Sequence, residues 1–236
     1  VLELGGSDPF VVLDDADLAE AAETGAWARN QNGGQSCIAA KRFVVVDDVY
    51  DAFVDRLVEE IESLTVGDPT DEDTDVGPQA RQDLMEGLHE QVAESVDAGA
   101  TVLTGGEPLD GEGAYYPPTV LADVPEGCPA DDEELFGPVA AVYRVPDEAA
   151  AVSKANDTQF GLGASVWTDD LDRGDRVASE IDAGCVYVNE LVKSDPRVPF
   201  GGVKESGYGR ELSGAGIREF VNRKTVWLQR PDDAEE

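Results

Sequence analysis

Residues 42–64 read RFVVVDDVYDAFVDRLVEEIESL, and this stretch decides the fold class. It opens with an apolar, largely β-branched run at 42–46, which is typical of a buried strand. The apolar residues that follow recur at helical spacing and share one face: Val49, Phe53, Val54, Leu57, Val58, Ile61 and Leu64. A buried strand that leads into an amphipathic helix is the repeating unit of α/β proteins.

The same alternation runs along the rest of the chain. The pattern predicts strands at 10–13, around 102–103, and at 139–145, 163–168 and 184–189, and helices over 17–29, 79–97, 147–157 and 171–181. Because these strands are apolar throughout, both faces of their sheet are expected to be covered by helices. We therefore expect an α/β fold built on an open parallel sheet.

The C-terminal stretch GIREFVNRKTVWLQR predicts a short helix followed by a strand at 224–229. Little chain follows this strand, and an isolated terminal strand needs a partner for its backbone donors and acceptors. Pairing within the chain is possible, but we favour pairing with another subunit.

Charge is the strongest signal in the composition. The chain has 51 acidic and 17 basic residues and a formal net charge of -34. Such a field repels nucleic acids and anionic membranes, and concentrated salt would screen its self-repulsion. The carboxylates are spread along the chain, which favours adaptation to a salty cytoplasm over a local binding site. A solvated acidic surface without special role is the alternative.

The sequence predicts neither a membrane span nor a signal peptide. Three widely spaced cysteines and a single histidine predict reduced thiols inside a cell, with no metal site and no disulfide framework. The opening VLELGGSDPF lacks an initiator methionine, so we expect a cut from a larger protein.

Cys37 is the most plausible nucleophile. It lies in RNQNGGQSCIAAKR, residues 29–42, where a short helical turn is expected to begin and to favour the thiolate through its amide dipoles. Cys128 lies in an acidic loop and Cys185 in an apolar strand, which favours packing. From composition alone, a packing role for Cys37 ranks ahead of catalysis. His89 is the only histidine, and its position on a predicted helix makes a cysteine–histidine mechanism a weak hypothesis.

Two carboxylates lie among apolar residues, where a charge is costly unless it is used. Glu3 stands in LELGG, and Glu134 in EELFGPV. A water-exposed edge strand for Glu3 and an acidic loop for Glu134 are the structural alternatives.

Six motifs in order, LELGGSDP, NGGQSC, EELFGPV, FGLGASVWT, GCVYVNE and PFGGVKESGYGRE, resemble the aldehyde dehydrogenase family across nearly the whole chain. The stretch NELVKSDPRVPFGGVKESGYGRELS is most similar to the succinate-semialdehyde dehydrogenase branch. The resemblance implies oxidation of a small-molecule aldehyde to a carboxylic acid with NAD or NADP as cofactor, in a cytoplasmic homo-oligomer, a dimer or a tetramer. From the acidic charge we expect no nucleic-acid or membrane partner.

The resemblance also implies roles for single residues. Cys37 would attack the aldehyde to give a thiohemiacetal and then a thioester, and Glu3 would activate the water that hydrolyses it. Gly33 and Gly34 would leave clearance beside Cys37, whose backbone N–H would help to hold the oxyanion. The residues implied at the cofactor are Gly5, Glu134 and Phe136.

Three further residues are candidates for the substrate. Phe200 resembles an aromatic wall of the aldehyde tunnel, and a core phenylalanine is about equally plausible. Ser194 and Arg197, together with Lys193, are candidates for binding a substrate carboxylate, because a distal anion needs a cation and a hydroxyl.

The resemblance divides the chain into a catalytic domain, 1–210, and a C-terminal helix with an oligomerisation strand, 211–236. The family's N-terminal dinucleotide-binding domain, with its asparagine for the oxyanion, is expected to be absent from this chain. Two alternatives stay open: an inactive fragment that acts only in oligomerisation, and a cofactor-independent thiol esterase that uses Cys37 and Glu3.

Overall fold

The computed structural model describes residues 1–230 and confirms the predicted α/β class. The strands are β1 (Leu2–Glu3), β2 (Asp8–Val12), β3 (Ala40–Val46), β4 (Thr101–Thr104), β5 (Thr119–Ala122), β6 (Val139–Val145), β7 (Gly163–Trp167), β8 (Cys185–Val188) and β9 (Gly207–Tyr208). The helices are α1 (Leu18–Asn30), α2 (Tyr50–Glu62), α3 (Gln82–Ala98), α4 (Pro129–Asp132), α5 (Glu148–Asn156), α6 (Leu171–Glu180) and α7 (Ser213–Glu219).

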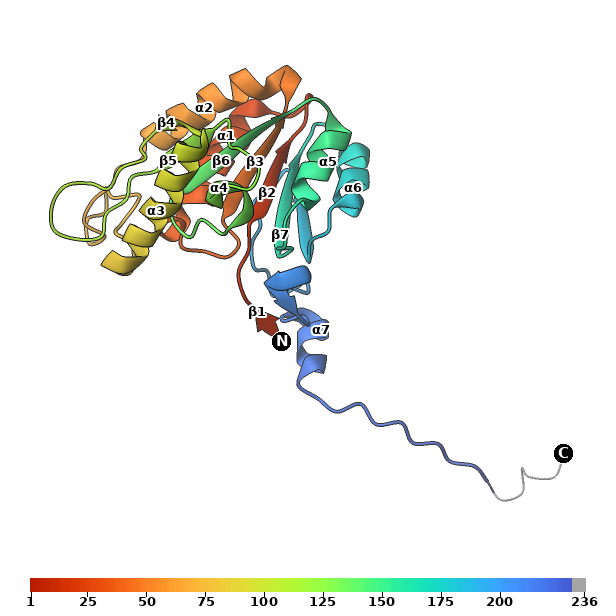
Figure 1. Ribbon diagram of the computed structural model, residues 1–236. Helices are drawn as coiled ribbons and strands as arrows, with labels where there is room; N and C mark the ends of the chain where they lie inside the picture. Colours follow the sequence, from red (N-terminus) through yellow and green to blue (C-terminus); the bar gives the residue numbers. More distant parts are fainter. Residues whose placement is uncertain (231–236) are drawn as a thin grey trace.

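Seven strands form one sheet in the order β4-β5-β6-β3-β2-β7-β8. All neighbouring pairs are parallel except β4 and β5, which are antiparallel at one edge. The short strand β5 was missing from the sequence prediction. A separate two-stranded sheet joins β1 to β9, and Figure 1 shows it with α7 below the large sheet.

Alternate side chains of the central strands enter two different cores. Phe10, Phe43 and their alternates pack against α1 and α2, whereas Val11 and Val44 face the opposite core with α5 and α6. Both faces are therefore covered, as the apolar strands predicted (Figure 1). Each fully buried side chain of this size stabilises the fold by about 1.5–3 kcal/mol.

Helix α1 lies close to the sheet because its inner face is small. Asp17 caps its first turn by accepting hydrogen bonds from the backbone N–H groups of Ala19 and Glu20. At Gly25 a Cβ atom would lie 2.9 Å from the ring of Phe43, so a larger residue would push the helix off the strand. The close contact holds α1 against β3, the strand that follows the Cys37 loop.

Residues 222–230 form neither helix nor strand, so the strand predicted at 224–229 is not formed among residues 1–230. Along this segment Val226, Trp227 and Leu228 are largely exposed. Over residues 1–230, every helix is too short or too polar to cross a bilayer.

Candidate active site

The candidate residues lie in segments that lead into three neighbouring parallel strands at the centre of the sheet. Glu3 comes before β2, Cys37 before β3 and Glu134 before β6. The register pairs Asp8 with Ala40 and Arg42 with Ala141, so the segments that lead into these strands lie side by side. The Cys37 loop, the Glu134 loop and the glycines Gly5 and Gly6 are thus brought together at the amino ends of neighbouring strands. Glu3 lies just before these glycines, on β1 of the small sheet.

The Cys37 loop differs from the expectation in one respect. A 3-10 turn, Gln31–Gly34, precedes the cysteine, and no helix begins after it; the backbone N–H of Ala39 instead donates to the Ser36 carbonyl in a turn centred on Cys37. The prediction of a helical turn whose dipole favours the thiolate was therefore wrong. The loop has to enter β3 within three residues of the cysteine, which leaves no length for a helix.

The Gly-Gly pair also has a different use from the one expected. A Cβ atom on Gly34 would lie 2.2 Å from the backbone carbon of Gly137, and one on Gly33 would lie 3.2 Å from the Gln35 amide. Both glycines have positive φ, which suits residues without a Cβ. The space at Gly34 is thus filled by the loop that carries Glu134, so this glycine packs two loops together and does not leave clearance for a ligand.

Cys37 is half-buried against an apolar cluster formed by Leu162, Val192 and Phe200. Burial raises the pKa of its thiol, and Lys41 opposes this rise while Asp8, Glu3 and Glu134 add to it. A thiol of this kind is protonated at neutral pH and needs a proton acceptor before it reacts.

Glu3 lies two residues before Gly5, and its charge adds to the rise that burial causes in the pKa of the Cys37 thiol. Its backbone pairs with Gly207 in the small sheet, and the carboxyl group is largely exposed in this chain. Partial burial, followed by the charge and hydrogen bond of Glu211, raises the pKa of Glu3. A carboxyl with a raised pKa is suited to accept a proton near neutral pH.

Glu211 was missed by the sequence analysis. It lies opposite Phe200, with which it exchanges two backbone hydrogen bonds of 3.0 and 2.7 Å. The only signal in the sequence was its position at the end of the motif PFGGVKESGYGRE. The fold thus brings the carboxyl groups of Glu3 and Glu211 together from opposite ends of the described chain.

The carboxylate of Glu134 contacts Gly5 and Gly6, the two glycines that follow Glu3 in the motif LELGG. Its Oε1 accepts a hydrogen bond of 3.2 Å from the backbone N–H of Gly6 and an ion-pair contact of 3.1 Å from Lys41. A Cβ atom on Gly5 would lie 2.6 Å from Oε2, so glycine is required for the carboxylate to lie there. Phe136 follows Glu134 by two residues, and its side chain is 44% exposed.

The candidate substrate residues lie in different environments, one buried and the others exposed. Phe200 is 3% exposed and is a core side chain of the Cys37 cluster. Ser194 is exposed, and Arg197 is 85% exposed and holds Asp195 through its guanidinium, with Nε 2.9 Å from Oδ1. Lys193 is paired with Glu190. Both candidate cations are therefore neutralised by carboxylates within three residues.

The other cysteines and the histidine are apart from this chemistry. Burial raises the pKa of Cys185 to about 12, and its Sγ lies 3.4 Å from the Leu162 carbonyl oxygen. Cys128 is buried in the core below α3. His89 lies on α3, with Nε2 3.6 Å from Glu107 and Nδ1 3.4 Å from the Tyr116 hydroxyl. It therefore has partners other than Cys37.

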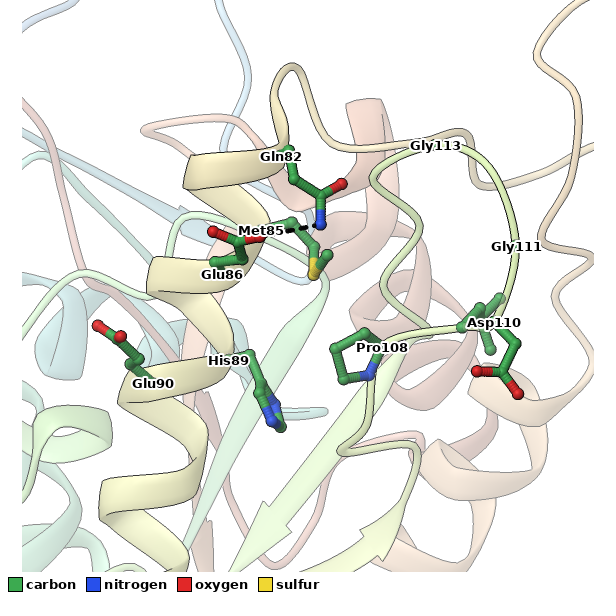
Figure 2. Close-up of a pocket in the computed structure, with 10 residues that line it drawn as sticks. Gln82, Met85, Glu86, His89, Glu90, Pro108, Asp110, Gly111 and Gly113 are labelled. Carbon is green, nitrogen blue, oxygen red and sulfur yellow. Dashed lines mark hydrogen bonds between the residues drawn. The ribbon is translucent and has the colours of Figure 1, made fainter.

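Figure 2 shows a hollow between α3 and the loop 108–113, lined by Gln82, Met85, Glu86, His89 and Glu90 on the helix. None of the predicted catalytic, cofactor or substrate residues lines it. Within residues 1–230, no three histidine, cysteine or acidic side chains are grouped as metal ligands would be.

The model of the aldehyde dehydrogenase family matches residues 1–226. The chain belongs to this family. A succinate-semialdehyde dehydrogenase (NADP+) of Mycolicibacterium paratuberculosis is 55% identical over 228 residues, which cover 97% of this chain and 48% of that protein. A protein of the same kind from Mycobacterium ulcerans is 54% identical and is covered to 50%.

A solved structure gives the same assignment. The succinic semialdehyde dehydrogenase of Streptococcus pyogenes, in complex with NADP+, superposes with a TM-score of 0.94 at 37% identity, over 97% of this chain and 50% of that one. The chain thus spans about half the length of the curated relatives that it matches.

Proposed function

We propose that this chain carries the catalytic residues of an NAD(P)-dependent aldehyde dehydrogenase that oxidises succinate semialdehyde to succinate. The observation that supports the proposal is that the Cys37 loop, the Glu134 loop and the segment that follows Glu3 come together at the amino ends of adjacent parallel strands. The names of the relatives support the substrate and favour NADP as the cofactor.

In the proposed reaction, Sγ of Cys37 bonds to the aldehyde carbon, and the carbonyl electron pair moves to the oxygen. Because the thiol is protonated at rest, it loses its proton to solvent before the attack. The oxyanion lies at the backbone N–H of Cys37. Among residues 1–230, no oxygen accepts a hydrogen bond from this N–H, so it is free to donate to the oxyanion.

The residues around Glu134 fit a nicotinamide nucleotide. Oε1 of Glu134 is held by the Gly6 N–H and Lys41, while Oε2 lies over Gly5 and can accept a hydrogen bond from a ribose hydroxyl. The exposed Phe136 ring offers an apolar surface beside it. When bound, the nucleotide supplies the acceptor for the hydride that leaves the thiohemiacetal carbon.

Glu3 carries the second half of the reaction. Its carboxylate takes a proton from a water molecule as the water oxygen bonds to the thioester carbon. The carbon–sulfur bond then breaks, the carboxylic acid leaves, and the proton held by Glu3 can return to the Cys37 sulfur. The raised pKa of Glu3 suits both transfers.

Arg197 and Ser194 are the proposed partners of the substrate's distal carboxylate, and Asp195 competes for the same guanidinium. A substrate carboxylate has to displace Asp195, so Asp195→Asn should lower KM for succinate semialdehyde and Arg197→Ala should raise it. An uncharged aldehyde of the same length is the control. Equal changes in KM for the charged and the uncharged aldehyde would rule out this role.

The domain division and the assembly belong to the same proposal. Residues 1–210 form the catalytic domain, and the exposed apolar side chains of 224–229 pair with a second copy in a dimer or tetramer. The family's dinucleotide-binding domain completes the cofactor site. Sedimentation of the full-length protein with and without residues 222–236 tests the assembly, and an unchanged mass would contradict it.

One alternative activity has support of its own. An esterase that cleaves its substrate through an acyl group on Cys37 needs this thiol and Glu3 but no nucleotide. The full-length protein is assayed with succinate semialdehyde and either nucleotide, and with a p-nitrophenyl ester alone. The proposal expects aldehyde-dependent reduction of NADP+ that is lost in Cys37→Ala. Ester cleavage without any nucleotide reduction would favour the esterase.

A further inference from the structure

Lys41 is a buried lysine that contacts the loop of the candidate nucleophile. Its side chain is 1% exposed, in a chain with only five lysines. Nζ lies 3.0 Å from the carbonyl oxygens of Ser36 and Cys37, 3.4 Å from that of Ala39 and 3.1 Å from Oε1 of Glu134. One ammonium group therefore has four acceptors, three of them in the Cys37 loop.

These contacts fix the direction of the peptide groups around Cys37. In a trans peptide the N–H points away from the carbonyl of the same unit. Since the Ser36 carbonyl faces Nζ of Lys41, the Cys37 N–H points away from the buried ammonium. The same holds for the Ile38 N–H, because the Cys37 carbonyl also faces Nζ. Lys41 thus orients the N–H at which the proposed oxyanion lies.

The fourth acceptor connects this loop to the proposed cofactor site. Oε1 of Glu134 is occupied by Lys41 and the Gly6 N–H. Within the described part of the chain, Oε2 has no hydrogen-bond donor. The ammonium therefore sets which carboxylate oxygen is left for a ligand, as well as where the carboxylate lies relative to Cys37.

The surroundings keep the ammonium charged although it is buried. Burial, followed by the charge of the neighbouring Arg29, lowers the pKa of Lys41 to about 8, and Glu134 and Asp8 oppose this fall. The group is thus mainly protonated at pH 7. Arg29, itself fully buried, donates from Nη2 to the Gly34 carbonyl at 2.6 Å and supports the same loop.

We propose that Lys41 is a positioning residue that couples the nucleophile loop to Glu134, so that Cys37, its N–H and the cofactor-binding carboxylate keep one geometry. This inference rests on the proposed function for the role of Glu134. The part that concerns Cys37 can be tested without any nucleotide.

The test uses the full-length protein with Lys41→Met, which removes the charge at similar length. Alkylation of Cys37 by iodoacetamide is followed by mass spectrometry across pH without nucleotide, and the dissociation constant of NADP+ is measured by titration. We expect the alkylation midpoint to move to higher pH, because Lys41 lowers the Cys37 pKa. We expect NADP+ binding to weaken about tenfold and kcat to fall by as much as about a hundredfold, as misplaced reacting groups do.

Lys154→Met is the matched control, because Lys154 also forms a shielded ion pair, 2.6 Å from Asp131, but makes none of these contacts with the Cys37 loop. A loss of stability alone should be common to both variants, whereas the alkylation profile and NADP+ affinity should change only in Lys41→Met. A Lys41→Met protein that melts earlier yet keeps both would overturn the proposal.

Lys41→Arg decides the matter if the methionine variant does not fold. It keeps the charge but places a planar group where a compact ammonium contacts four oxygens. We expect normal alkylation midpoints with weakened NADP+ binding, and wild-type NADP+ affinity in this variant would contradict the proposal. If the wild-type protein binds neither nucleotide, the proposed function fails while the alkylation measurement still tests Lys41.

Discussion

At the scale of single residues, the proposed site combines a thiol and a carboxyl whose pKa values are both raised. Burial produces the first shift, and burial with a second carboxyl produces the other. Neither residue is activated by a histidine, since His89 lies on α3 beside Tyr116. The proposed chemistry therefore depends on a carboxyl pair whose members come from opposite ends of the chain.

Replacing Glu211 tests this dependence. Its charge and hydrogen bond raise the pKa of Glu3, so Glu211→Gln should lower that pKa. A general base works only when deprotonated, and the acidic limb of the kcat profile should then move to lower pH. Steady-state rates of the full-length enzyme across pH measure this limb. A limb that stays in place, or moves to higher pH, would contradict the assigned pairing.

Sequence reasoning proposed Cys37, Glu3 and Glu134 as site residues but missed two charged residues that act on them, Lys41 and Glu211. Cys37, Glu3 and Glu134 stood out because a thiol and two carboxylates lay beside glycines or within apolar runs. Lys41 and Glu211 carry no such local signal, because their partners, Glu134 and Glu3, are 93 and 208 positions away in the chain. Only the fold reveals that these charges are shared.

At the scale of elements, the site arises from parallel strands in register. The long apolar strands and amphipathic helices were predictable, since each fills a core on its own face of the sheet. β5 was not, because four residues behind two prolines carry too little periodicity to be told from a loop. The Gly33–Gly34 pair was predicted to leave clearance beside Cys37. The contact that Gly34 makes between two loops could not be predicted, because it depends on the position of Gly137, 103 residues further along the chain.

Gly34→Ala should separate these two loops. The new methyl group would overlap the Gly137 backbone at 2.2 Å, and φ at residue 34 is +72°, which costs a residue with a Cβ about 1–2 kcal/mol before any overlap. We expect a loss of stability above about 2 kcal/mol in chemical denaturation, with activity reduced at least about tenfold.

Gly87→Ala is the control for this variant. Gly87 lies within α3 and a Cβ there would meet nothing within 4 Å, so alanine should stabilise the protein by about 0.5–1 kcal/mol. Equal effects of the two substitutions would show that the loop contact at Gly34 does not matter.

At the scale of the whole molecule, the main feature is the large negative net charge. Acidic residues outnumber basic ones by 51 to 17, and their repulsion opposes the compact state. Local networks offset part of it, such as the contacts of Arg173 with Asp14, Asp15 and Glu148. Adaptation to a salty environment is the interpretation that this balance favours, and it stays a prediction.

Salt should therefore stabilise the protein. Raising KCl from about 0.1 M to about 1 M shortens the screening length from about 10 Å to about 3 Å, and the melting temperature of the full-length protein should rise. Equal osmolality of sucrose is the control for effects other than screening. A melting temperature that stays level or falls with KCl would contradict the interpretation.

The central claim is that Cys37 bonds to the carbonyl carbon and that Glu3 then activates the water that attacks the same carbon. Trapping the intermediate tests this claim most directly. Glu3→Gln in the full-length protein is mixed with succinate semialdehyde and NADP+, quenched in acid and digested for mass spectrometry. We predict a succinyl thioester on the Cys37 peptide that accumulates far above the wild-type level, because its hydrolysis lacks the base. Wild-type turnover by Glu3→Gln, or an acyl group on Cys128 or Cys185 instead, would contradict the claim.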